Sequence, residues 1–188
     1  MKKVFLIAIV MMSTMLGNLK AQPLSYTYVI QKEGATAEQI YNALMDFIAT
    51  DFLATDGDFY RDKEQFVIIK DVRTKFKADY QYGWYDGNIR YKIKFQCRDG
   101  RFKVEITNFY HTSQYIGNPK LKVLDAPRSA GIIMNTWEEQ VLSSEVGNCP
   151  PEEILNQMIN KCKAEAETMK TKMESLEMGS AAQDQEDW

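Results

Sequence analysis

The chain has 188 residues, of which 23 are Lys or Arg and 26 are Asp or Glu, so its formal charge at pH 7 is −3. This acidic balance argues against a nucleic-acid partner, because such binding depends on neutralising phosphates with Lys and Arg. Three cysteines are too few and odd in number for a disulfide framework, and the length suits one domain with a core.

Residues 1–21 have the pattern of a secretory signal peptide. Two lysines near the start precede an apolar stretch over 4–16, which is too short for a comfortable membrane span. Ala21 suits cleavage before Gln22, although an uncleaved anchor is the alternative. Cleavage removes three lysines and no acid, leaving 20 basic and 26 acidic residues, so the charge becomes −6. We therefore expect an exported protein, periplasmic or extracellular, with no stable transmembrane span after cleavage.

The domain that follows is expected to begin with a strand over 24–31 and a helix after Thr36. The strand alternates and is rich in β-branched and aromatic residues. Thr36 and Gln39 have capping-box spacing, and an apolar stripe with helical periodicity then continues to residue 52. Residues 58–61 and 65–78 form a second hairpin around 62–64, and the alternation loses phase near Lys70, which predicts a β-bulge there.

The central element is a hairpin over 88–110. Asp99-Gly100 is typical of a two-residue type I′ turn. The register then pairs Cys97 with Phe102, Phe95 with Val104, Ile93 with Ile106 and Tyr91 with Asn108 on one apolar side. On the polar side, Lys94 lies opposite Glu105 as a cross-strand pair of opposite charge.

The C-terminal part contains a less regular insert over 111–148 and a long helix over 150–177. Within the insert, 121–124 could be a short edge strand, and Asn135–Ser143 a short helix capped by Asn135. The long helix has an apolar stripe at steps of three and four. Residues 179–188 form an acidic tail that we expect to be disordered. Cys97 and Cys162 are expected to be buried free thiols, because stacked elements lie about 10 Å apart.

These elements predict a single α+β domain over residues 22–178. Their β-α-β-β-β-β-α order gives a two-layer sandwich, in which a curved antiparallel sheet is covered by an N-terminal helix and a long C-terminal helix.

The segment YKIKFQCRDGRFKVEITNF over 91–109, with the turn at 62–64 and the signal peptide, resembles a known family. This is the domain of unknown function family 4468, exported bacterial proteins with a TATA-binding-protein-like (TBP-like) fold. The resemblance covers about residues 26–110. It implies the fold but no catalytic residue, since the family has no established activity. The fold name implies no DNA binding either, because function must be argued from a site.

No catalytic, cofactor-binding or metal site is indicated. His111 is the only histidine, and no set of Cys, Asp or Glu surrounds it at ligand spacing, so we interpret it as a hydrogen-bonded residue at a strand end. The sequence also lacks a Gly-rich phosphate loop and a nucleophile with a base context.

Two groups of residues are candidates for a binding surface. The polar side of the central hairpin has a local charge of +4 and carries the basic residues Lys92, Lys94, Arg98, Arg101 and Lys103. An aromatic loop supplies Tyr82, Trp84 and Tyr85 as a stacking platform or protein anchor. The plainer interpretations are a soluble sheet face and a cover for one end of the core.

The preferred hypothesis is a non-enzymatic binding or protein-interaction module of the cell envelope that uses both groups, with Trp84 exposed beside the basic face. Its partner is unknown, with an envelope protein or an anionic glycan as candidates. The alternatives are a small hydrolase or transferase with a cleft between helix and sheet, and a structural module that self-associates through its C-terminal helix.

Overall fold

The computed structural model describes residues 21–51, 59–114, 128–144 and 149–178. Its elements in chain order are β1 (Tyr26–Gln31), α2 (Ala37–Asp51), β2 (Phe59–Asp62), β3 (Val67–Phe76), the 3-10 helix η1 (Tyr80–Tyr85), β4 (Gly87–Arg98), β5 (Arg101–Ser113), β6 (Gly131–Ile132), α3 (Trp137–Ser143) and α4 (Glu152–Glu174). The signal peptide expected over 1–21 lies outside the described residues except for Ala21. The edge strand expected over 121–124 and the tail expected over 179–188 lie outside them entirely.

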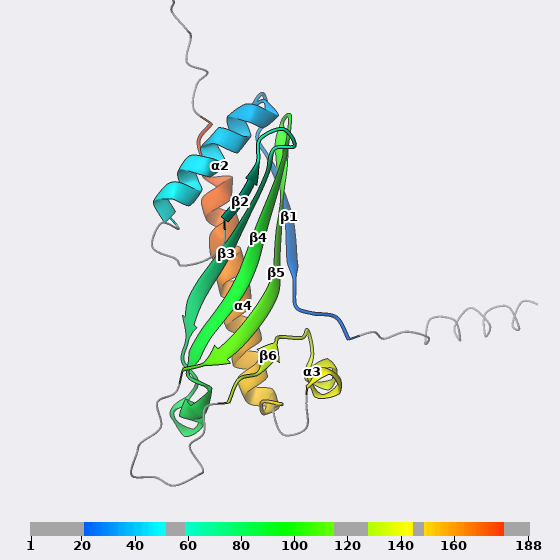
Figure 1. Ribbon diagram of the computed structural model, residues 1–188, viewed down its shortest axis with the longest axis vertical. Coiled ribbons are helices and arrows are strands. Elements are labelled where there is room, and N and C mark those ends of the chain that lie inside the picture. The colour runs from blue at the N-terminus through cyan, green and yellow to red at the C-terminus, as the bar shows by residue number, and fades with distance from the viewer. Residues whose placement is uncertain (1–20, 52–58, 115–127, 145–148, 179–188) are drawn as a thin grey trace, which may run out of the picture.

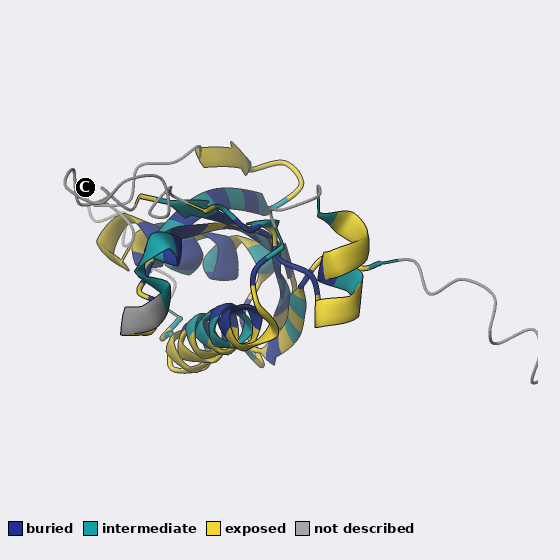
Figure 2. Cartoon of the chain, turned by 90° about the horizontal axis from the view of Figure 1, so that it is seen from below, coloured by how far each residue is buried: buried dark blue, intermediate teal, exposed yellow. Residues whose placement is uncertain are grey.

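The sheet is antiparallel, with strand order β1-β5-β4-β3-β2, and β6 pairs with β5 beyond the end of β1. Helices α2 and α4 both lie on one side of it, as Figure 1 shows. In Figure 2 the buried stripes of the strands and the buried sides of the helices face one another. The predicted fold class, a two-layer α+β sandwich, is thus confirmed.

The central hairpin has the predicted register over most of its length. Phe95 pairs with Val104, Ile93 with Ile106 and Cys97 with Phe102, and all six side chains are buried. The turn itself differs from the prediction. Gly100 has a φ of +73°, but among the described non-glycine residues only Phe66 and Asn108 have positive φ, so the turn is not type I′.

The reason for this turn geometry is tertiary contact with the segment that leads into α2. The amide of Gly100 donates to the Ala35 carbonyl at 2.8 Å, and the Asp99 carboxylate accepts from the Ala37 amide at 2.8 Å. Asp99 therefore satisfies one of the unpaired amides at the start of α2 and places a negative charge at its positive end. The hairpin turn and the helix position each other.

The bulge predicted in β3 is wrong. β3 pairs with β4 without interruption from Val67 to Phe76, so Lys70 occupies an inner position at 8% exposure and Ile69 faces outward. The apolar stem of a lysine makes such a position tolerable. The irregularity lies in β5 instead, opposite Tyr91, so the predicted pairing of Tyr91 with Asn108 is wrong. There Asn108 has a φ of +58°, a conformation that Asn adopts more readily than most residues.

Local capping signals account for the helix starts. The Thr36 hydroxyl accepts from the Gln39 amide at 3.2 Å, and the Gln39 side chain accepts from the Thr36 amide at 2.8 Å, so the predicted capping box is confirmed. In α3 the cap is Thr136, one residue later than predicted, and it accepts from Glu139.

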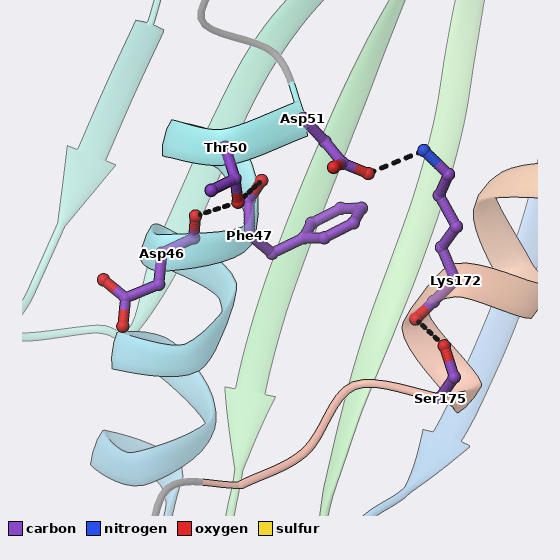
Figure 3. Close-up of polar contacts among 6 residues, drawn as sticks. All are labelled: Asp46, Phe47, Thr50, Asp51, Lys172 and Ser175. Atoms are coloured by element: carbon purple, nitrogen blue, oxygen red, sulfur yellow. Dashed lines mark hydrogen bonds and ion pairs between the residues drawn. The ribbon is translucent and has the colours of Figure 1, made fainter.

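The two long helices meet at their C-terminal ends. Lys172 of α4 forms an ion pair with Asp51 of α2 at 2.6 Å, and Figure 3 shows both side chains reaching across the gap. Beside this pair, the Thr50 hydroxyl donates to the backbone carbonyl of Asp46 at 2.7 Å, within the last turn of α2. The contact links the C-terminal ends of the two helices.

The apolar stripe of α4 is buried against the sheet. Its buried residues are Ile154, Leu155, Met158, Cys162, Ala166, Met169 and Met173. Cys97 and Cys162 are buried and free, as predicted. Burial raises the pKa of both thiols to about 12, so both stay protonated and act as small apolar side chains.

Among the residues that the structure describes, no helix is both long and apolar enough to cross a membrane.

Candidate functional site

The face of the sheet opposite the helices, which we call the outer face, is strongly basic. The pairing of β3, β4 and β5 places on it the basic residues Arg73, Lys75, Arg90, Lys92, Lys94, Arg98, Arg101 and Lys103. The acidic residues on the same face are Asp62, Asp71 and Glu105. Eight basic and three acidic side chains give this face a formal charge of +5 in a chain whose net charge is −3.

All five basic residues predicted from the sequence lie on the outer face, and β3 adds Arg73 and Lys75, while β4 adds Arg90. Arg73 and Lys75 were missed because the bulge predicted near Lys70 disguised which residues of β3 share a face. The uninterrupted alternation of β3 after residue 70 was the signal that could have revealed them. Arg90 was missed although it continues the alternation of Lys92 and Lys94 on β4.

The acids on the outer face neutralise only part of the charge. Asp71 pairs with Lys92 at 3.6 Å, and Glu105 pairs with Lys103 at 2.5 Å. Lys94 lies directly opposite Glu105 as predicted, but the carboxylate forms its ion pair with Lys103, two residues away on its own strand. Within the described part of the chain, Lys94 has no ion-pair partner.

Two pairs of arginines stand directly opposite each other on neighbouring strands. Arg98 pairs with Arg101 beside the hairpin turn, and Arg73 pairs with Arg90 near the other end of the sheet. Like charges in directly opposed positions destabilise a sheet by roughly 0.2–1 kcal/mol. Among the described residues, the Nε atom of Arg73 is buried without a hydrogen-bond partner. The two pairs lie about 27 Å apart along β4, at about 3.4 Å per residue.

The arginine pair at the turn borders a hollow of about 450 Å³. The hollow is lined by Val29, Gln65, Val67, Gln96, Cys97, Arg98, Arg101, Phe102 and Lys103. Three of these residues are cationic and two carry amides, whereas none is acidic. Guanidinium groups bind carboxylates and phosphates in a bidentate manner, so this hollow has the donors for a planar or tetrahedral anion.

The aromatic loop does not join this site. η1 lies beyond the start of β4 and the hairpin turn beyond its end, so the 12 residues of β4 separate them by about 40 Å. Trp84 is half-buried, and its ring centroid lies 6.0 Å from that of Tyr82. The Cζ atom of Arg128 lies over the Trp84 ring, 5.9 Å from its centroid. Tyr85 is fully buried. The expectation of an exposed Trp84 beside the predicted basic residues is therefore wrong, and Tyr85 is not part of any surface.

His111 has a structural environment rather than a catalytic one. It is fully buried, not at the boundary. Its Nε2–H donates to the Tyr85 carbonyl at 2.9 Å, and its Nδ1 accepts from the Ala130 amide at 3.1 Å. Burial lowers the pKa of the imidazole to about 4, so the ring is neutral at pH 7 and both nitrogens are occupied. Nor do the described residues contain a cluster of three His, Cys, Asp or Glu side chains placed to hold a metal ion.

Comparisons with known proteins bear on the fold. Residues 26–112 match the family described as "Domain of unknown function (DUF4468) with TBP-like fold", which confirms the resemblance expected over about residues 26–110. No curated protein matches the chain.

Two solved structures resemble the chain at low sequence identity. A TBP-like protein from Parabacteroides distasonis has a TM-score of 0.55 at 13% identity, covering 82% of this chain and 95% of that one. A DUF4468 family protein from Bacteroides ovatus has a TM-score of 0.54 at 13% identity, covering 84% and 90%. Likeness at this identity shows the fold alone. Residues 26–112 are therefore similar to the DUF4468 domain, and the fold of the chain is TBP-like.

Proposed function

We propose that the protein is a non-enzymatic binding module of the cell envelope, and that its outer face binds a carboxylate-rich segment of another protein. The signal-peptide pattern of residues 1–21 supports an exported location. The charge of +5 on one face of an acidic chain supports an anionic partner, since such a face attracts and orients opposite charge.

One observation carries this proposal: Arg98 and Arg101 face each other beside a hollow that no acidic residue of the described chain lines. Opposed guanidinium groups repel in the free protein, and a carboxylate between them would turn that repulsion into two charge-assisted contacts. Gln65 and Gln96 add neutral donors and acceptors at the same hollow. A face that only kept the sheet soluble would gain nothing from placing arginines directly opposite each other.

A protein partner is favoured over an anionic glycan by the position of the aromatic loop. Sugar binding commonly uses an exposed aromatic ring beside the polar groups. Here Trp84 is half-buried and lies at the opposite end of β4 from the hollow. An anionic glycan thus becomes an outcome of the test.

The other two hypotheses have less support. The α4 stripe that self-association would use is packed on the sheet. A cleft between helix and sheet would need converging titratable groups, whereas the inner residues Ile68, Ile93, Phe95, Phe102 and Val104 are fully buried and apolar.

The test is titration of the protein with a fluorescein-labelled hexaglutamate peptide, with polygalacturonate as the glycan arm. We expect Arg98→Gln/Arg101→Gln to weaken hexaglutamate binding at least about tenfold, which corresponds to about 1.4 kcal/mol. The control Lys161→Gln/Lys163→Gln removes the same charge from α4 and should change binding by less than about twofold. Equal binding by both double variants would refute the proposal, and binding of polygalacturonate alone would replace the protein partner with a glycan.

Export is tested separately by fractionating a bacterial host that expresses the protein and measuring the intact mass of the recovered chain by mass spectrometry. The expected mature protein begins at Gln22 in the periplasmic or secreted fraction. An intact chain that begins at Met1 and stays with the membranes would show an uncleaved anchor instead.

A further inference from the structure

We propose that the acidic segment 179–188 docks into the Arg98–Arg101 hollow and masks it. This inference rests on the proposed function of the outer face as a carboxylate-binding surface. The segment reads GSAAQDQEDW: it contains Asp184, Glu186 and Asp187, has no basic residue and carries Trp188. The same segment then indicates the class of external partner, an acidic peptide that displaces it.

The described chain stops close to the hollow. The Nζ of Lys32 donates to the carbonyls of Glu174 at 2.8 Å and Leu176 at 2.5 Å. The amide of Lys32 donates to the Gly100 carbonyl at 2.8 Å. The segment after α4 is thus one lysine side chain away from the turn that carries both arginines. Figure 1 shows the end of α4 and the tip of the β4–β5 hairpin at the same end of the molecule.

The path from this point to the hollow is short. α4 covers the inner face, and the carbonyls at its C-terminal end contact Lys32, which directly follows β1. The edge of the sheet at β1 is therefore the near route to the outer face. Val29 of β1 already lines the hollow. Strands lie about 4.8 Å apart, and the six residues from Met178 to Asp184 can span about 20 Å. The segment therefore has ample length to bring its carboxylates over β1.

The chemistry of the segment complements the hollow. Its three carboxylates match the three cations Arg98, Arg101 and Lys103 in number. Lys103 is already paired with Glu105, so the arginines have the larger share of free charge. Val29, 56% exposed, offers an apolar contact for an aromatic side chain such as Trp188.

Tethering makes a weak contact effective. A segment joined by a short linker has a local concentration in the millimolar range. Docking with an intrinsic dissociation constant about two to nine times below this local concentration occupies the hollow in roughly two thirds or more of the molecules. It then lowers the apparent affinity for an external ligand about three- to tenfold. The segment acts as an internal competitor that only a stronger acidic partner displaces.

The first experiment locates the segment in the full chain by zero-length carbodiimide cross-linking, which joins a carboxylate to a lysine amine within contact distance. We expect amide links from Asp184, Glu186 or Asp187 to Lys103, and their loss at 0.5 M NaCl, where charges are strongly screened. Lys75, at the other end of the outer face, is the matched negative control. Links equally frequent to Lys75, or absent from Lys103, would overturn the docking.

The second experiment measures hexaglutamate affinity of the full chain with Asp184→Asn/Glu186→Gln/Asp187→Asn. We expect binding roughly three- to tenfold tighter than in the unaltered chain. The control Asp46→Asn/Glu138→Gln/Glu153→Gln removes the same charge elsewhere and should leave affinity within about twofold.

The two proposals fail in different ways. If both variants bind hexaglutamate as the unaltered chain does, and binding still depends on Arg98 and Arg101, the docking is refuted and the proposed function stands. If no variant binds the peptide, the proposed function is refuted, and the cross-link to Lys103 alone decides the docking.

Discussion

Alternating residues of the same two strands form the inner and outer faces of the β4–β5 hairpin, but the two faces have different roles. On the inner face Ile93, Phe95 and Val104 are fully buried and fix the register. On the outer face Lys94, Arg98 and Arg101 are solvent-facing, and two of them repel each other. A register specified by one face leaves the other free to hold charges that do not favour folding. The comparison separates what holds the fold from what serves a ligand.

The largest difference between the faces should appear on truncating neighbouring residues of β4. Phe95→Ala removes a fully buried ring and should lower the free energy of unfolding by about 3–5 kcal/mol. Lys94→Ala, one residue away, should change it by no more than about 0.5 kcal/mol. Urea denaturation measures both, and comparable losses would show that the faces are not distinct in this way.

The next largest effect concerns the end of the sheet that lacks the hollow. His111 has a folded pKa of about 4 against about 6.5 in an unfolded chain, so the unfolded state binds more protons between these values. The contribution of the neutral ring to the free energy of unfolding is thus fully present above pH 6.5. It decreases as the pH falls and is lost by about pH 4, a change of about 3 kcal/mol.

His111→Gln removes this titration. The difference in unfolding free energy between the variant and the unaltered protein should therefore shrink as the pH is lowered from 7 to 4. A difference that stays constant over this range would show that the imidazole does not titrate as its buried position implies.

A smaller effect is expected at the hairpin turn. Gly100 has a φ of +73° and open space where a Cβ would lie, so Gly100→Ala introduces backbone strain without a clash and should cost about 1–2 kcal/mol. Because the turn also contacts the segment before α2, amide exchange should increase at the start of α2 as well as in the turn. Unchanged exchange at α2 would mean that the two elements are not coupled.

The smallest effect belongs to the exposed ion pair between α2 and α4. A double-mutant cycle on Asp51 and Lys172 should give a coupling of about 0.2–1 kcal/mol that disappears in high salt. Its side chains are 31% and 52% exposed, so a much larger coupling would indicate that the helix layer depends on this contact more than on the buried stripes.

The inner face and the helix starts could be predicted because their signals are local. Alternation around Asp99-Gly100 gave the register of the hairpin, and Thr36 with Gln39 gave the start of α2. The turn type could not be predicted, since it depends on a contact with Ala35 from a distant part of the sequence. The bulge at Asn108 did have a local signal: inner apolar residues step by three from Ile106 to Phe109.

The candidate site could be predicted only in part. The basic residues of the central hairpin were found because one register places them together. Arg73 was missed, because its face depends on whether β3 is regular after Lys70, and a lysine at an inner position mimics a phase change. The hollow depends on the alignment of Val29 on β1 with Lys103 on β5, which no local pattern records. Trp84 was misplaced, because it packs against Tyr82 and the core and Arg128 from the insert lies over its ring.

The most direct test of the separation between the two faces is to measure folding and binding on the same variant, Arg98→Gln/Arg101→Gln. Removing an opposed like-charge pair should leave the free energy of unfolding unchanged or raise it by a few tenths of a kcal/mol, while hexaglutamate binding falls at least about tenfold. A variant that is less stable by more than about 1 kcal/mol, or that binds the peptide as well as the unaltered protein, would contradict the account.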